Sequence, residues 1–265
     1  MPNYLTVIED ESERFLSAVL AADPATRVPT CPEWTAGDLL WHLTEVHAFW
    51  AGILGSGATT DEQSEAVEAA KPERPDSTEA VVRIFREQTA ELLAQLRRRK
   101  DTEAAWFWLD TAQNVGSTRR MQAHEATMHR LDAEMAAGRP PTPVSSPELA
   151  MAGLAHGVEV MWAWWGTLPG FTFTPTGGAV ALVGEDLGES YLVQPGRWRG
   201  VGQSGKSYDE PGAVAAPGAT PSATISGTAE QVYRWLWGRG DLPPTVSGDQ
   251  ASLDALTRAR DQGMQ

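Results

Sequence analysis

The chain has 265 residues, of which 42% are hydrophobic and 21% are charged, a balance typical of a folded globular protein. Its 21 basic and 35 acidic residues give a net charge of −14, which disfavours binding to nucleic acid or to an anionic membrane surface. One cysteine, Cys31, excludes an intrachain disulfide, and there is neither a signal-peptide pattern nor an apolar run long enough to cross a membrane. We therefore expect a cytoplasmic protein without nucleic-acid or membrane partners.

The N-terminal half shows helical periodicity. Apolar residues recur at three- and four-residue spacing. Thr35 and Asp38 resemble a capping box, which marks the start of the second helix. Residues 55–77 are polar and predict a loop or a frayed helix, and an aromatic segment at 106–108 predicts a connecting loop. Four amphipathic helices favour a helix bundle, with the helices expected over 4–22, from Thr35 past Ile53, over 78–98 and over 118–137.

The second half has a different character. A proline-rich linker near 138–148 leads into a fifth helix over 147–165. Short alternating segments then predict strands, while residues 203–221 are rich in Gly, Ser, Pro and Ala and predict a loop. We expect a helix bundle over 1–166 and a smaller α+β domain over 167–265, with strands at 171–174, 179–183, 191–194 and 223–226 and helices at 228–238 and 252–261.

The fourth helix carries a pair of metal-ligand residue types. Glu125 and His129 are four residues apart, so they project from one helix face. A carboxylate and an imidazole facing the interior of a bundle need a partner, and a divalent cation satisfies both. A third ligand would come from the second helix, where periodicity leaves His42 and His47 as alternatives. Asp132 lies on the same face as the pair.

Two motifs then narrow these alternatives. Residues 28–43 read VPTCPEWTAGDLLWHL, with Trp34 eight residues before His42, and residues 124–134 read HEATMHRLDAE. Together they closely resemble the mycothiol-dependent maleylpyruvate isomerase family of the DinB-like metalloprotein superfamily. The strand and helix at 225–239, ending in Leu-Trp-Gly-Arg, resemble the C-terminal domain of the same family. The resemblance implies a DinB-like four-helix bundle followed by a small sterol-carrier-like α+β domain.

The resemblance also implies a chemistry. It places the metal ligands at His42, Glu125 and His129, with zinc as the favoured divalent metal and mycothiol as thiol cofactor or cosubstrate. A metal-bound thiolate would attack a small electrophile, either to transfer sulfur or to isomerise a double bond between cis and trans. We expect His47 and His124 not to bind the metal, and we expect a monomer or a small homo-oligomer.

Two further residues receive catalytic roles as expectations. Arg239 is a candidate for holding a carboxylate of the substrate or the thiol, the alternative being a surface arginine after a helix. Asp132 is a candidate for assisting the reaction, the alternative being a pair with a nearby arginine. Two other functions stay open: a non-catalytic metal-binding or regulatory protein of the same fold, and a metal-dependent hydrolase that uses water instead of a thiol. Cys31 is expected to be a small buried residue.

Overall fold

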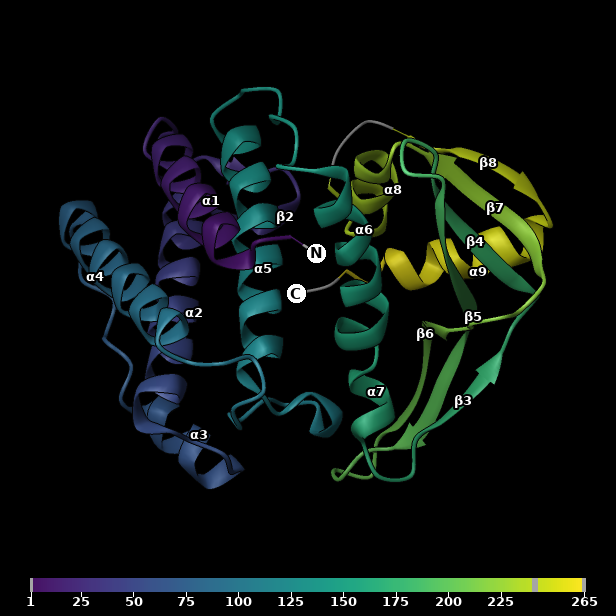
Figure 1. Cartoon of the computed structure of the whole chain (residues 1–265), viewed down its shortest axis with the longest axis horizontal. Coiled ribbons are helices and arrows are strands. Elements are labelled where there is room, and N and C mark those ends of the chain that lie inside the picture. The colour runs from purple at the N-terminus through teal and green to yellow at the C-terminus, as the bar shows by residue number, and fades with distance from the viewer. Residues whose placement is uncertain (1, 240–242, 264–265) are drawn as a thin grey trace. The chain divides into compact units, whose positions relative to one another are not determined.

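The computed structural model describes residues 2–239 and 243–263, and the chain divides into two compact units, Pro2–Thr142 and Pro143–Gln265 (Figure 1). The division falls inside the proline-rich linker, earlier than the expected boundary at residue 166. The reason is that helix α6 (Pro147–His156) packs on α8 (Ala229–Leu236). Gly153 has no side chain to clash with Tyr233, and the Trp237 indole donates a 3.1 Å hydrogen bond to the Gly153 carbonyl. The fifth helix therefore belongs to the C-terminal unit.

The N-terminal unit contains the four expected long helices, shown in purple to teal in Figure 1. Phe15, Leu39, Leu43 and Phe85 are among the side chains that fill its buried core. The capping box predicted at the start of the second helix is present, because the Thr35 hydroxyl accepts from the amide of Asp38, and Asp38 accepts from the Thr35 amide. The helices are α1 (Tyr4–Val19), α2 (Ala36–Ser56), α4 (Thr78–Arg97) and α5 (Val115–Ala136).

Three local features of this unit were not predicted from the sequence. The segment expected to be a loop or a frayed helix contains a regular helix, α3 (Asp61–Ala69), which the Thr60 side chain caps. Helix α5 starts three residues early because Asn114 caps it by accepting from the Ser117 amide. Strands β1 (Arg27–Val28) and β2 (Cys31–Thr35) form a small antiparallel hairpin. The hairpin places Pro29 and Thr30 in a tight turn.

The C-terminal unit is a mixed sheet with helices, as expected for an α+β domain. The described strands follow the order β3-β5-β4-β7-β8, with β6 also paired to β5. Strands β4 and β7 run parallel, and the other pairs are antiparallel. Figure 1 shows α8 and α9 on one side of this sheet. The strands are β3 (Thr172–Pro175), β4 (Ala179–Gly184), β5 (Glu189–Val201), β6 (Ser207–Ala215), β7 (Pro221–Gly227) and β8 (Thr245–Gly248), and α9 spans Gln250–Arg260.

Strand β6 occupies the segment that was predicted to be a loop. Its backbone pairs with β5 from Val193 to Val201, and this pairing stabilises the strand although its sequence is not typical of strands. Position 212 in this strand requires glycine, because a Cβ atom there would lie 2.6 Å from the Trp198 ring. Before the sheet in the sequence, a π-helical turn (Gly157–Met161) interrupts the expected fifth helix, and the short α7 (Trp164–Thr167) follows it. In the described part of the chain, no helix is long and apolar enough to cross a membrane.

Candidate metal centre

Two helices of the N-terminal unit bring three metal-ligand side chains together. His42 projects from α2, and Glu125 and His129 project from α5 one turn apart. The Glu125 Oε1 atom lies 3.2 Å from His42 Nε2 and 3.2 Å from His129 Nε2. One donor atom from each residue lies within 4.8 Å of the other two. Among the described residues, this is the one group of three or more ligand-type side chains with that spacing.

The hydrogen bonding of His129 directs its Nε2 atom at this centre, where either a proton or a cation can bind. His129 Nδ1 lies 2.9 Å from Asp132 Oδ2, and a carboxylate can only accept, so Nδ1 carries the proton. His129 Nε2 and Glu125 Oε1 would then face each other with lone pairs unless a proton or a cation lies between them. Burial favours the neutral imidazole, but the bonds to Asp132 and Glu125 outweigh it and raise the pKa of His129 to about 9. The donor set therefore fits a cation at its centre.

The carboxylate of Glu125 is adapted to remain charged in this position. Burial opposes its ionisation, but hydrogen bonds and charge interactions with His129 and His42 hold the pKa of Glu125 well below its usual range. An ionised carboxylate and two imidazoles form a donor set that suits zinc and related divalent metals. The side chains of His42 and Glu125 are 30% and 20% exposed, whereas that of His129 is 6% exposed. The centre is therefore reachable from solvent on the side of His42 and Glu125.

A second layer of side chains fixes the orientation of His129. Asp132 is fully buried, and its Oδ1 atom accepts a 2.5 Å hydrogen bond from the Thr30 hydroxyl. The turn between β1 and β2 thus connects to the side of α5 that carries the candidate ligands. The Trp34 ring packs over both imidazoles, with ring centroids 4.5 Å from His42 and 6.0 Å from His129. Sequence reasoning named Asp132 but missed Thr30, although Thr30 lies inside the motif that carries His42.

A buried ion network lies beside the centre on α5. The Arg130 guanidinium is fully buried and binds Glu11 of α1 through Nε at 2.6 Å. Its Nη1 atom binds Glu134 at 2.8 Å and the Thr142 carbonyl at 2.6 Å. Arg130 thus ties α1, α5 and the end of the N-terminal unit together. Asp132 bonds to His129 and Thr30, so it contacts a residue of the candidate centre.

The remaining histidines lie elsewhere in the structure. His47 is fully buried toward α4, with Nδ1 2.8 Å from the Thr89 hydroxyl. His124 is fully buried with its ring edge-on to Tyr4, and His156 is buried and stacks on Trp237 in the C-terminal unit. Neither His47 nor His124 belongs to the cluster of ligand atoms found among the described residues.

Two other sequence candidates are placed as follows. Arg239 lies in the C-terminal unit directly after α8, where it is 4% exposed and donates from Nη1 to the Trp237 carbonyl at 2.8 Å. It is therefore not the surface arginine that was the alternative interpretation. Cys31 is 2% exposed, which confirms the expectation of a small buried residue.

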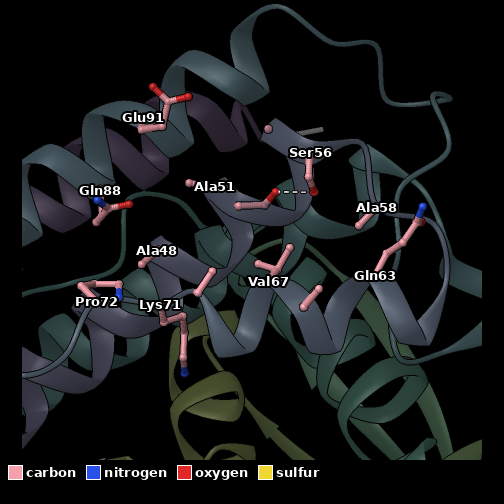
Figure 2. A pocket seen from close by; sticks show the side chains of 14 residues that line it. Ala48, Ala51, Ser56, Ala58, Gln63, Val67, Lys71, Pro72, Gln88 and Glu91 are labelled. Carbon is pink, nitrogen blue, oxygen red and sulfur yellow. Dashed lines mark hydrogen bonds between the residues drawn. The ribbon is translucent and has the colours of Figure 1, made fainter.

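A separate pocket of about 660 Å³ opens between α2, α3 and α4 (Figure 2). Small side chains such as Ala48, Ala51 and Ala58 form much of its lining, and Ser56 donates a 2.8 Å hydrogen bond to the Gly52 carbonyl at its wall. None of the three candidate metal ligands lines it. Donor geometry, rather than cavity size, therefore identifies the candidate centre.

Comparisons with known proteins agree with the motifs. Residues 5–134 match the model of the mycothiol maleylpyruvate isomerase N-terminal domain, and residues 148–255 match the model of the MDMPI C-terminal domain. A crystal structure of the mycothiol-dependent maleylpyruvate isomerase matches with a TM-score of 0.56 at 17% identity, covering 95% of this chain and 96% of that chain. A histidine-to-alanine mutant of that isomerase matches with a TM-score of 0.55 at 15% identity, with the same coverage. No curated protein sequence matches significantly. Because the two domain models together span most of its length, the chain belongs to the mycothiol maleylpyruvate isomerase family.

Proposed function

We propose that this protein is a metal- and mycothiol-dependent enzyme that acts on a small electrophile, by cis–trans isomerisation or by sulfur transfer. The observation that carries the proposal is the convergence of His42 Nε2 and His129 Nε2 on Glu125 Oε1, at 3.2 Å each. Two imidazoles and one carboxylate leave coordination positions open, as catalytic sites require. Family membership, with a matched structure named as a mycothiol-dependent maleylpyruvate isomerase, supports mycothiol as the thiol.

The roles of the residues follow from their charges and contacts. His42, Glu125 and His129 would hold the cation, and their single negative charge leaves the centre positive, so it attracts an anionic sulfur. A divalent cation bound there lowers the pKa of a coordinated thiol enough to deprotonate it at neutral pH. Asp132 keeps the Nδ1 proton of His129 in place, so that Nε2 faces the centre. Trp34 covers the two imidazoles and limits their rotation.

The thiolate can complete either of two reactions. In isomerisation it adds to an activated double bond, which becomes a single bond that rotates; elimination then restores the double bond and releases the thiolate. In sulfur transfer it displaces a leaving group, and the new carbon–sulfur bond is kept. Both begin with attack by the same thiolate, so the substrate decides between them. Maleylpyruvate is the first substrate to test, because the matched structures are named for it.

Arg239 is proposed to bind a carboxylate of the substrate or the thiol. Guanidinium groups bind carboxylates in a bidentate manner, and an electrophile of the maleylpyruvate type carries such groups. We expect Arg239→Gln to raise the KM for an anionic substrate, with a smaller relative change in the metal content of the protein. An equal KM in the variant and the wild type, with the C-terminal unit folded, would reject it.

The decisive experiment measures turnover of the zinc-loaded protein on maleylpyruvate with and without mycothiol. We expect turnover with mycothiol and none without it, and loss of turnover in Glu125→Gln. Glu45→Gln is the matched control, because Glu45 is a carboxylate on α2 that pairs with Lys71 rather than with the centre. Consumption of substrate at equal rates without thiol would establish a hydrolase instead. Absence of turnover with several electrophiles, in protein that binds mycothiol and metal, would favour a binding protein.

A further inference from the structure

The pocket between α2, α3 and α4 has walls of two kinds (Figure 2). Helices α2 and α3 face it mostly with short or apolar side chains, whereas α4 contributes the polar side chains of Gln88 and Glu91. Its volume of about 660 Å³ lies within the roughly 300–1,000 Å³ that is common for sites that bind small molecules. The apolar part of the lining includes Ala48, Ala51, Gly52 and Gly55 of α2 and Ala66 and Val67 of α3.

Contacts at both ends hold α3 beside this pocket. At the start of the helix, Asp61 Oδ1 accepts a 2.8 Å hydrogen bond from the Trp106 indole. Just after its end, Lys71 Nζ lies 3.3 Å from Glu45 Oε1 of α2. The two contacts tie α3 to the segment before α5 and to α2. The pocket is therefore enclosed by an anchored helix and is part of the folded N-terminal unit.

The composition of α3 explains why this helix leaves the space open. Within Asp61–Ala69, all of which the structure describes, Ser64 alone is buried. The helix approaches α2 closely at Gly52, where a Cβ atom would lie 2.6 Å from Val67 Cγ1. Ala66, one residue before Val67, has a single methyl group and lines the pocket without filling it. An apolar molecule that enters the pocket would therefore cover apolar surface of both helices, and this burial favours binding.

Carboxylates outnumber cations around the pocket. Lys71 is the cation of the lining, but its ammonium group already lies 3.3 Å from Glu45 and 2.6 Å from Glu68. Glu91 on α4 has Arg98 at 3.7 Å, and both of these side chains are at least half exposed. Three carboxylates thus meet two cations in a chain whose net charge is −14. This balance disfavours anionic ligands, which distinguishes the pocket from a site for carboxylate substrates.

We propose that this pocket is a second binding site, which takes a small molecule with an apolar body and a neutral or cationic polar end. The apolar body lies against the alanine and glycine surface of α2 and against Val67 of α3. The polar end points to α4, where the Gln88 amide oxygen and the Glu91 carboxylate can accept hydrogen bonds from a hydroxyl or an ammonium group. The site needs neither the metal nor a thiol, so it is independent of the proposed function.

Three probes of matched shape test this chemistry. Benzylamine, benzyl alcohol and benzoate share one aromatic ring and differ in the charge of the polar end. Binding to the zinc-loaded full chain is followed by two-dimensional amide NMR, with the amides of Gly52 and Gly55 as reporters inside the pocket. We expect a Kd of about 1 mM for benzylamine and benzyl alcohol, and binding about fivefold weaker for benzoate. Equal binding of benzoate, or no shift of either glycine with any probe, would overturn the proposal.

Substitutions in the two walls provide the controls. Ala66→Leu adds three carbons at the pocket and should weaken the binding of benzylamine by about tenfold. Ala69→Leu makes the same change at an exposed residue of α3 outside the lining and should bind as the wild type does. Glu91→Gln should weaken benzylamine by about threefold and leave benzyl alcohol unchanged, whereas Glu87→Gln on α4, outside the lining, should change neither. Wild-type affinity in Ala66→Leu, or equal losses in Ala66→Leu and Ala69→Leu, would overturn the site.

Discussion

Thr30 and Asp132 are 102 residues apart in the sequence, yet the Thr30 hydroxyl donates a 2.5 Å hydrogen bond to Asp132 Oδ1. The other carboxylate oxygen, Oδ2, accepts from His129 Nδ1 at 2.9 Å. The turn of the small hairpin thus fixes a carboxylate that in turn fixes the imidazole of a candidate metal ligand. Partners of metal-bound histidines set ring orientation and basicity, and their loss commonly weakens metal binding by about 10- to 100-fold.

The first prediction tests this chain of contacts. Thr30→Val keeps the side-chain shape and removes the hydroxyl, so Asp132 loses the hydrogen bond to its Oδ1 atom. We expect the affinity for Zn²⁺, measured by competition with a chromogenic chelator, to fall by about tenfold. Thr30→Ser restores the hydroxyl and should restore most of the affinity. Equal affinities in Thr30→Val and Thr30→Ser would show that the hydroxyl does not act on the metal centre.

The second prediction concerns the ligands themselves. We expect one divalent metal per chain, and we expect His42→Ala, Glu125→Ala and His129→Ala each to lose most of it, because each substitution removes one of three donors. Elemental analysis of purified protein gives the metal content, and circular dichroism reports whether the helices persist. Glu45→Gln should retain the metal. A full equivalent of metal in folded His129→Ala would reject the assignment.

The sequence predicts the site in part. Periodicity and spacing identify Glu125 and His129 as neighbours on one face, and the structure places them so. Periodicity leaves His42 and His47 as alternatives, because their orientation depends on which helix each side of α2 contacts: His42 meets α5, whereas His47 meets Thr89 of α4. The contact between Thr30 and Asp132 depends on tertiary packing, so no local pattern signals it.

The fold is predicted where apolar periodicity is strong and missed where polar residues dominate. The long helices of the N-terminal unit follow from their apolar stripes. For residues 55–77 the sequence left a loop and a frayed helix as alternatives, because the helix that forms there, α3, has little apolar surface to bury, with Ser64 as its buried residue. Strand β6 was missed because its Gly and Ser content is typical of loops, whereas pairing with β5 stabilises it. The early boundary of the C-terminal unit depends on Gly153, whose contact with Tyr233 is also tertiary.

The third prediction compares a buried ion pair with an exposed one. Arg130 is fully buried with Glu11 and Glu134, so Arg130→Met would remove the buried cation that both carboxylates bind and leave Glu11 with only the half-exposed Arg14 as a cationic partner among the described residues. We expect the free energy of unfolding to fall by about 3–5 kcal/mol in urea denaturation. Arg97 also pairs with a glutamate of α1, Glu9, but both side chains are about half exposed. Arg97→Met should cost less than about 1 kcal/mol. Similar losses in the two variants would contradict this distinction.

The fourth prediction concerns the pH dependence of stability, and it depends on His47. The Thr89 hydroxyl donates to the Phe85 carbonyl at 2.7 Å, so it must accept from His47 Nδ1. The other nitrogen, Nε2, has no partner among the described residues, so a proton added there would find no acceptor. Burial is the main cause that lowers the pKa of His47 to about 3; nearby Glu125 opposes the shift, and His129 and His42 add to it.

A histidine with a depressed pKa in the folded state favours folding at high pH and opposes it at low pH. Above its ordinary pKa of about 6.5, His47 is neutral in both states and its contribution is complete. As the pH falls below 6.5, the unfolded chain takes up a proton that the folded chain refuses, until about pH 3. On going from pH 8 to pH 5, this one residue should lower the free energy of unfolding by about 2 kcal/mol.

Urea denaturation of metal-free protein at pH 8 and at pH 5 measures this difference in the free energy of unfolding. In His47→Gln the difference should shrink by that amount, because glutamine does not titrate, whereas Thr44→Val, a buried change on the same helix, should keep the wild-type difference. An unchanged difference in His47→Gln would show that His47 does not titrate as the structure implies.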